Sequence, residues 1–177
     1  MLKLRPDEMG RLSVEGFRQA EKVGLVVVLD NIRSAYNVGA MFRTADAFRI
    51  EGLAVCGVSP YPPSPLIHKT ALGAEEAVDW KHFGSAVEAV EGLKKKGYLV
   101  CGLEITHSSV DIRTFVVPRG QKVALVVGNE VHGVEEEVLR LCDECVEIPQ
   151  RGTKHSLNVA SAAAIAMWHI VANAVAL

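Results

Sequence analysis

The chain has 177 residues, of which 49% are hydrophobic and 23% are charged. A chain of this length buries most of its apolar surface in one core, and its hydrophobic content excludes an intrinsically disordered protein. The 19 basic and 21 acidic side chains give a formal net charge of -2, so the molecule has no overall positive field that would attract nucleic acid. Any nucleic-acid binding must therefore depend on a local basic patch.

The first residues, Met1–Asp7, contain no apolar run of signal-peptide length, so we expect a cytoplasmic protein with reduced cysteines. Cys56 and Cys101 lie in apolar runs and are expected in the core. Cys142 and Cys145 form a C-x-x-C pair, but no second Cys/His pair at ligand spacing accompanies them. The sequence therefore predicts no metal site and leaves the role of this pair open.

Hydrophobic runs and capping signals predict alternating helices and strands. In chain order, we expect a helix at Arg5–Lys22, a strand at Leu25–Leu29, a helix at Asn37–Phe48, a strand at Leu53–Val58, a helix at Ser85–Lys96, strands at Leu99–Leu103 and Val123–Val127, a helix at Glu135–Leu141 and a strand at Cys145–Ile148. This alternation predicts an α/β fold with a mostly parallel sheet and helices on both faces. The segment Ser59–Pro65 is interpreted as a stiff loop and not as a boundary. Residues 1–177 are thus expected to form a single domain, with residues 1–24 as a short N-terminal helical extension.

The C-terminal segment Leu157–Leu177 is apolar over about the 20 residues that a membrane crossing needs. Ser161, His169 and Asn173 interrupt it, and alanine, which favours insertion only weakly, supplies much of the rest. The segment is therefore predicted to be a helix buried against the domain or against a second subunit, and not a membrane span.

Three polar loops each follow a predicted strand. They are Asn31–Gly39, with Arg43 close behind it, Gly128–Gly133, and the turn within Val146–Ala160. The carboxyl ends of parallel strands meet at one edge of a sheet, so the three loops can converge on one crevice. The chain contains neither G-x-G-x-x-G after the first strand nor a P-loop motif, which disfavours a dinucleotide or nucleoside triphosphate site.

Taken together and in this order, the three loops resemble the three motifs of the SpoU/TrmH branch of the SPOUT methyltransferases. The resemblance extends from Leu25 to the C-terminus. It implies a C-terminal deep trefoil knot, which the hydrophobic pattern alone would not predict. It also implies methyl transfer from S-adenosyl-L-methionine, leaving S-adenosyl-L-homocysteine, to a ribose 2′-hydroxyl of tRNA or rRNA by a homodimer without a metal ion.

The resemblance assigns site residues position by position. The polar catalytic set would be Asn37, Arg43, Glu130, Ser156 and Asn158. The cofactor would contact Leu103, Glu104, Gly128, Ile148 and Leu157. The RNA would contact the charged or imidazole side chains of the motif loops, Arg33, Arg151, Lys154 and His155, within a wider basic set that includes Arg49 and Lys69.

The chemistry of Arg43 argues against a role as general base, because a guanidinium is effectively never deprotonated in proteins. We hypothesise that Arg43 binds an RNA phosphate and stabilises the developing alkoxide, while phosphate, water or Glu130 accepts the proton. Simpler interpretations stay open for three residues. Asn37 and Ser156 would serve equally well as helix N-caps, and Glu130 as part of a surface turn.

Two other functions compete with ribose methylation. A base methyltransferase of another SPOUT branch would share the cofactor site but would not need Arg43 and Asn158 in these roles. A catalytically silent RNA-binding or assembly protein would keep the fold, although nothing in the fold alone requires four polar groups in three loops.

Overall fold

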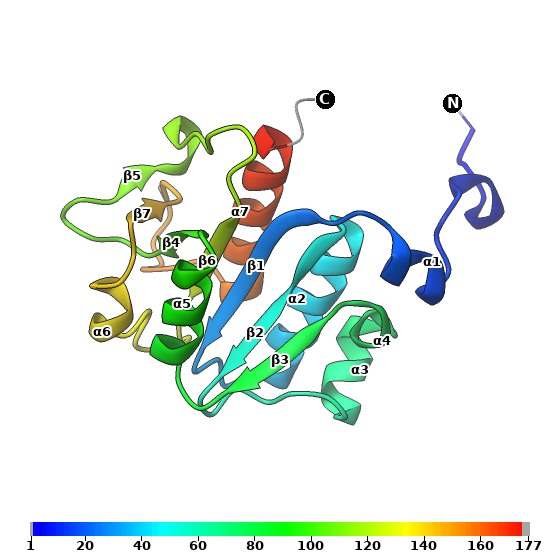
Figure 1. Ribbon diagram of the computed structural model, residues 1–177, viewed down its shortest axis with the longest axis horizontal. Coiled ribbons are helices and arrows are strands. Elements are labelled where there is room, and N and C mark those ends of the chain that lie inside the picture. The colour runs from blue at the N-terminus through cyan, green and yellow to red at the C-terminus, as the bar shows by residue number, and fades with distance from the viewer. Residues whose placement is uncertain (1, 175–177) are drawn as a thin grey trace.

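The computed structural model describes residues 2–174 and contains one seven-stranded sheet in which all paired strands are parallel (Figure 1). The strand order is β3-β2-β1-β6-β4-β7-β5. The strands are β1 (Val23–Asp30), β2 (Ile50–Cys56), β3 (Trp80–Phe83), β4 (Leu99–Leu103), β5 (Val110–Asp111), β6 (Val123–Val127) and β7 (Glu144–Glu147). The predicted α/β fold with a parallel sheet is therefore confirmed.

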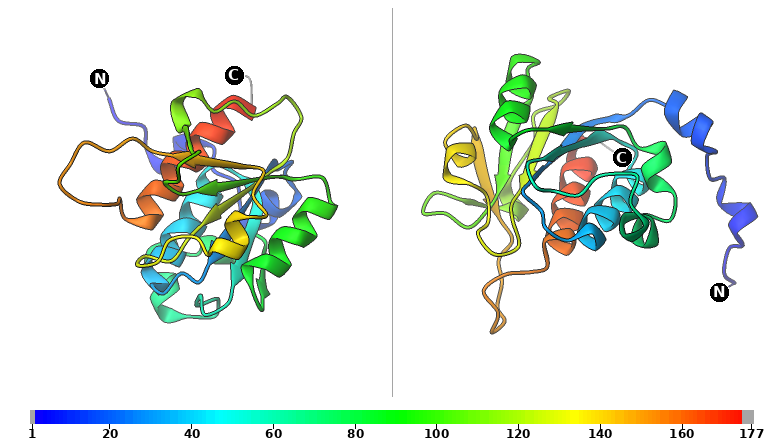
Figure 2. Two further views of the ribbon diagram at one scale, coloured as in Figure 1. Left: turned by 90° about the vertical axis from the view of Figure 1, so that its left-hand side faces the viewer. Right: turned by 90° about the horizontal axis from the view of Figure 1, so that it is seen from below.

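Helices cover both faces of the sheet, as the sequence predicted (Figures 1 and 2). The α-helices are α1 (Val14–Gln19), α2 (Ala35–Ala47), α3 (Pro65–Ala71), α4 (Ala74–Ala77), α5 (Ala86–Lys95), α6 (Glu136–Leu139) and α7 (Val159–Ala174). Helices α2, α3, α4 and α7 pack on one face, around Leu25, Val27 and Leu29 of β1. Helices α5 and α6 pack on the other face, around Val28 and Val126. Because successive strand residues point to opposite faces, the continuous apolar run of β1 serves both cores.

The predicted helix at Arg5–Lys22 is wrong in its extent. The structure has a 3-10 helix η1 at Pro6–Met9 and a separate α1, and Gly10 ends η1 in the left-handed region at φ 60°. A glycine in the left-handed conformation is a common way to end a helix, so this segment does not continue as one helix. Phe17 of α1 is buried at 5% exposure and attaches the extension to the domain.

Five short elements were not predicted, namely α3, α4, β3, β5 and the 3-10 helix η2 (Ile112–Thr114). Helix α3 begins at Pro65, the last residue of the predicted stiff loop, where proline fits the first turn of a helix. Strand β3 is an edge strand of sequence WKHF, and two of its four residues are exposed, so it lacks the apolar run of a central strand.

Helix α7 corresponds to the predicted C-terminal helix, whose last predicted residues, 175–177, lie outside the described part of the chain. One face of α7 is fully buried against the domain, with Ala163, Ala166 and Met167 at 0% exposure. On the opposite face Ile165 is 43% and Trp168 55% exposed. None of the helices formed by residues 2–174 combines the length and the apolar character that a bilayer crossing demands.

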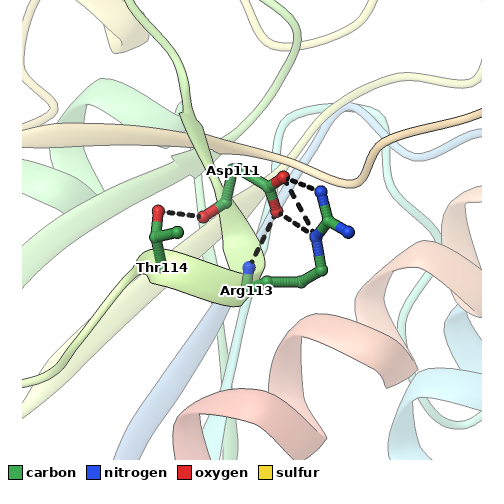
Figure 3. Close-up of polar contacts among 3 residues, drawn as sticks. All are labelled: Asp111, Arg113 and Thr114. Carbon is green, nitrogen blue, oxygen red and sulfur yellow. Dashed lines mark hydrogen bonds and ion pairs between the residues drawn. The ribbon is translucent and has the colours of Figure 1, made fainter.

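Strand β7 lies between β4 and β5, which follow one another in the chain. The segment 104–122 therefore leaves β4, pairs with the far side of β7 and returns to β6, while His169 of α7 hydrogen-bonds the Phe115 carbonyl within that segment at 2.7 Å. Figure 3 shows the turn after β5, where the Asp111 carboxylate accepts hydrogen bonds from the Arg113 guanidinium and, at 2.9 Å, from the Arg113 backbone N–H, while the Thr114 hydroxyl donates to the Asp111 carbonyl at 2.9 Å. This order of strands is compatible with a threaded C-terminus, and the trefoil knot itself stays a prediction.

Candidate active site

A cavity of about 670 Å³ lies at the carboxyl ends of β4, β6 and β7. The loops that follow β6 and β7 both contribute to it, and the loop that follows β1 borders it through Glu130. The predicted convergence of the three polar loops on one crevice is therefore observed. Beyond β7, residues 149–158 form a long loop that projects from the body of the domain before α7 begins (Figure 2).

The structure brings all five predicted cofactor residues to the wall of this cavity. They are Leu103, Glu104, Gly128, Ile148 and Leu157. Leu103 and Ile148 are half-buried and also pack against the main core. Leu157 keeps 39% of its surface exposed and is free to contact a ligand.

Gly128 ends β6 at a point where no side chain fits. A Cβ at this position would lie 2.1 Å from the carbonyl carbon of Gly133 and 2.1 Å from the backbone nitrogen of Val134. The turn that causes this close approach is closed by two backbone hydrogen bonds of 2.9 Å between Asn129 and Gly133. The Glu104 carboxylate accepts a 3.0 Å hydrogen bond from the Val134 N–H and holds the turn from the other side. This part of the cavity wall is thus a backbone turn that is fixed by close packing and by hydrogen bonds.

Glu130 is held by three donors, two from the loop between β1 and α2 and one from the first turn of α2. Its carboxylate accepts hydrogen bonds from the backbone N–H of Arg33 at 2.9 Å, from that of Ser34 at 3.0 Å, and from the Asn37 side-chain amide at 2.8 Å. Burial raises the pKa of Glu130, but these hydrogen bonds outweigh it and leave the pKa below its ordinary value. Glu130 therefore lies in the turn between Asn129 and Gly133, as the simpler interpretation expected, but its carboxylate is ionised and anchored by hydrogen bonds.

Asn37 connects Glu130 to the third loop. Its side-chain oxygen accepts a 3.1 Å hydrogen bond from the Asn158 amide, so Glu130, Asn37 and Asn158 form a continuous polar chain from three separate motifs. Because the NH2 group and the oxygen of each amide are both hydrogen-bonded, the orientation of both side chains is defined.

The helix-cap interpretation of Asn37 and Ser156 is wrong. The cap of α2 is Ser34, whose hydroxyl accepts a hydrogen bond from the Asn37 backbone N–H at 3.3 Å. At the start of α7 the Asn158 side chain accepts hydrogen bonds from the N–H groups of Ala160 and Ser161 at 3.0 and 3.2 Å. Asn158 thus combines the capping and the site roles. Ser156 is exposed on the cavity wall.

The basic residues are distributed unevenly around the site. His155 lines the cavity, while the exposed Arg151 and Lys154 stand on the same projecting loop. Arg33 is exposed next to Glu130 and contributes only its backbone to the carboxylate. Arg43 is exposed on α2 and is not among the described residues that line the cavity. A single chain therefore does not bring Arg43 to the cavity.

Sequence reasoning missed a second polar group behind the site. Asp30, at 0% exposure, accepts a 2.9 Å hydrogen bond from the Glu135 N–H, and burial raises its pKa. Asn31, in the left-handed region at φ 54°, accepts a 2.7 Å hydrogen bond on its carbonyl from the Asn129 side chain. The signal in the sequence was a pair of polar residues directly at the end of a buried strand, which is where site residues gather in α/β folds.

The cysteines contribute no metal cluster to the part of the chain that the structure describes. Across residues 2–174, no three His, Cys, Asp or Glu side chains are grouped so that they could hold a metal ion. All four cysteines are free thiols. Burial raises the pKa of Cys142 to about 12 and also raises that of Cys145, so neither is an activated thiolate.

Comparison with known proteins identifies relatives of this architecture. The model of the SpoU rRNA Methylase family matches residues 24–168. A Staphylococcus aureus protein named for the TrmH family of tRNA/rRNA methyltransferases is 30% identical over 155 residues, which cover 86% of this chain and 61% of that protein. The chain thus spans about three fifths of the length of such curated relatives.

Solved structures agree with the sequence relatives. An rRNA methyltransferase from Sinorhizobium meliloti, crystallised with AdoMet bound, superposes with a TM-score of 0.78 at 28% identity, over 86% of this chain and 58% of that one. A structure concerned with the 2-OH methylation of C/U34 on tRNA superposes with a TM-score of 0.74 at 25% identity, over 84% of this chain and 95% of that one.

Proposed function

Because the chain belongs to the SpoU rRNA methylase family, we propose that it transfers a methyl group from S-adenosyl-L-methionine to a ribose 2′-hydroxyl of tRNA or rRNA. The observation that carries the proposal is the polar chain of Glu130, Asn37 and Asn158 beside a cavity whose wall contains every predicted cofactor residue. A relative of similar structure was crystallised with AdoMet, and the structure of another concerns 2-OH methylation of C/U34 on tRNA, which supports both parts of the proposal.

The cavity wall suits an adenosyl ligand. When bound, S-adenosyl-L-methionine supplies an electrophilic methyl group on a sulfonium, so the protein itself needs no metal ion for this chemistry. Gly128 allows the turn behind it to pack against the end of β6, because a Cβ there would collide with the backbone of that turn. Ile148 and Leu157 offer the apolar surface on which an aromatic base packs. The product would be S-adenosyl-L-homocysteine.

Glu130 acts in this mechanism as a positioning residue and not as the proton acceptor. Its two oxygens already accept three hydrogen bonds, and its lowered pKa makes it a weak base. Its role is to hold Asn37, which with Asn158 orients the ribose by hydrogen bonding. Of phosphate, water and Glu130, only an RNA phosphate and water therefore stay as candidate proton acceptors.

Arg43 has the chemistry to bind an RNA phosphate bidentately and to stabilise the developing alkoxide. Its place on the outer side of α2, away from the cavity of its own chain, favours a two-fold dimer in which Arg43 serves the cavity of the second subunit. The exposed apolar residues Ile165 and Trp168 on the adjacent α7 are suited to bury themselves in such an interface. The remaining RNA contacts would come from Arg33, Arg151, Lys154 and His155.

Subunit complementation tests the shared site. One inactive protomer carries Arg43→Ala and the other Asn158→Ala, and the two are mixed after reversible dissociation. A heterodimer with shared sites contains one doubly damaged site and one intact site, so activity should reappear. If subunit exchange is verified by mass spectrometry and activity stays absent, the shared site is excluded while the methyltransferase proposal stands.

The chemistry is tested with purified protein, labelled S-adenosyl-L-methionine and unmodified tRNA and rRNA transcripts. Mass spectrometry of nucleosides from the product RNA should find a 2′-O-methylated nucleoside. A methylated base would instead identify the base methyltransferase alternative. Binding of RNA without transfer of label, with every transcript class tested, would favour the silent RNA-binding protein.

A further inference from the structure

An aromatic surface lies on the opposite half of the sheet from the cavity, outside the three motifs. The ring of Tyr61, in the loop after β2, lies 4.6 Å from that of His82 and 5.9 Å from that of Trp80, with interplanar angles of 42° and 30°. Tyr61 keeps 47% of its surface exposed, and His82 is also exposed. We call these three residues the Tyr61 platform.

Hydrogen bonds tie the Tyr61 platform to the loop that holds Glu130. The side-chain oxygen of Asn31 accepts a 3.1 Å hydrogen bond from the Val58 N–H, and the Ser59 hydroxyl accepts a 2.8 Å hydrogen bond from the Ile32 N–H. His82 hydrogen-bonds the Gly57 carbonyl at 3.1 Å. Asn31 and Ile32 directly precede Arg33 and Ser34, so the loop that carries Tyr61 is fixed relative to the active site.

We propose that the Tyr61 platform stacks an unpaired nucleobase of the RNA substrate, near the nucleotide that is methylated. This inference rests on the proposed function. Proteins that recognise unpaired RNA commonly stack its bases on Tyr, Phe, Trp or His side chains, and such stacking tolerates any base. Strand β3 is three strands away from β6, which at the usual strand spacing is roughly 14 Å, so the platform would receive a neighbouring base and not the target itself.

The charges around the platform define the direction of the RNA backbone. The exposed Arg33 lies on the tethered loop, whereas the Lys81 ammonium lies 4.9 Å from the Phe83 ring, on the face of β3 opposite to His82. The acidic Glu76 and Asp79 lie beyond Trp80, at the other end of β3. A phosphate is therefore favoured at the end that faces the active site, which places the RNA between the platform and the cavity.

A purely structural role for Tyr61 makes a different prediction. Trp80 is half-buried on an edge strand, and any large apolar residue at position 61 would shield it as well as tyrosine does. Leucine at position 61 keeps this shielding and removes the aromatic face, while phenylalanine keeps both. The pair Tyr61→Leu and Tyr61→Phe therefore separates stacking from packing.

The experiment measures RNA affinity of the full chain, saturated with S-adenosyl-L-homocysteine, for the transcripts that the wild-type protein methylates. Tyr61→Leu should weaken binding about 10-fold, equivalent to about 1.4 kcal/mol, whereas Tyr61→Phe should stay within about twofold of wild type. Affinity for S-adenosyl-L-homocysteine and the melting temperature should be unchanged in both variants. With 5-iodouridine in the transcript, ultraviolet cross-linking should join RNA to Tyr61 in the wild-type protein.

Each outcome decides the inference. Equal RNA affinity of Tyr61→Leu and wild type, with no cross-link at Tyr61, overturns the stacking role and leaves the methyltransferase proposal intact. A drop in melting temperature of Tyr61→Leu that matches its loss of RNA affinity assigns a packing role and also overturns the inference. If the wild-type protein binds and methylates no RNA at all, the proposed function fails, and the inference fails with it.

Discussion

Glu130→Gln replaces the anchored carboxylate with an amide of almost the same shape. The glutamine oxygen can still accept from the Ser34 N–H and the Asn37 amide, which share one carboxylate oxygen at 3.0 and 2.8 Å. The glutamine NH2 then faces the Arg33 N–H, donor against donor, where the carboxylate accepted a 2.9 Å hydrogen bond. One hydrogen bond to a charged group contributes about 1.5–3 kcal/mol, and the half-buried position of Glu130 places its loss at the lower end. Turnover should fall by about 10-fold to 100-fold.

The stability that ionised Glu130 contributes changes with pH in a defined direction. The folded-state pKa of Glu130 is lowered, so its ionisation stabilises the fold above the unfolded pKa, and this stabilisation is lost as the pH falls through the folded-state value. Wild type should therefore melt at a higher temperature than Glu130→Gln at pH 7, and the difference should shrink as the pH drops below about 4.3, the ordinary pKa of a glutamate. Calorimetry at both pH values and single-turnover methyl transfer at pH 7 measure the two effects.

Glu136→Gln is the matched control. The Glu136 side chain is 86% exposed and pairs with Arg140 one helical turn away, so its stability change should stay within about 0.5 kcal/mol and turnover should be normal. The positioning role of Glu130 would be refuted by a variant that loses all turnover but keeps wild-type stability at every pH, together with a wild-type rate that falls off below neutral pH. That combination describes a general base.

Three further predictions concern Gly128, Arg43 and Cys142. Gly128→Ala forces a Cβ to within 2.1 Å of backbone and should abolish cofactor binding in a calorimetric titration, whereas Gly152→Ala, with open space at its Cβ, should bind normally. Arg43→Lys keeps the charge but loses the bidentate fork, so transfer should slow by the equivalent of about 2.7–4 kcal/mol with cofactor affinity unchanged; near-normal turnover that rises steeply with pH would instead support a side-chain base. Under native conditions a maleimide should label the half-buried Cys142 before the fully buried Cys56, as peptide mass spectrometry would show, and equal labelling would contradict the burial described.

Central strands were predictable because burial on both faces leaves a continuous apolar run. The run Leu25–Leu29 lies wholly within β1, and Val123–Val127 coincides with β6. Edge strands carry no such signal, since one side contacts loops or solvent, and β3 and β5 were accordingly missed. The type and the parallel direction of the central elements could therefore be predicted from local sequence. The position of β7 between β4 and β5 could not, because it depends on contacts that no local pattern records.

In the site, motif resemblance located the residues but not their contacts. Asn37 contacts Glu130 and Asn158, two other members of the predicted polar set, whereas the helix caps are formed by Ser34 and Asn158. The bond between the Asn129 side chain and the Asn31 carbonyl joins residues 98 positions apart, and it depends on β1 and β6 being neighbours in the sheet. Polar partners of this kind follow from strand order, which has to be known first.

The charges of the cavity bear on where RNA phosphates would lie in the proposed function. None of the described residues that line it is a lysine or an arginine, whereas Glu104, Glu130 and Glu147 line it and are acidic. Such a wall disfavours a phosphate inside the cavity but accommodates a neutral ribose next to a cationic sulfonium. In the proposed function, phosphates would be held at the rim, by the projecting loop and by an arginine from a second subunit. This division predicts that raising the salt concentration weakens RNA binding steeply and leaves cofactor binding almost unchanged.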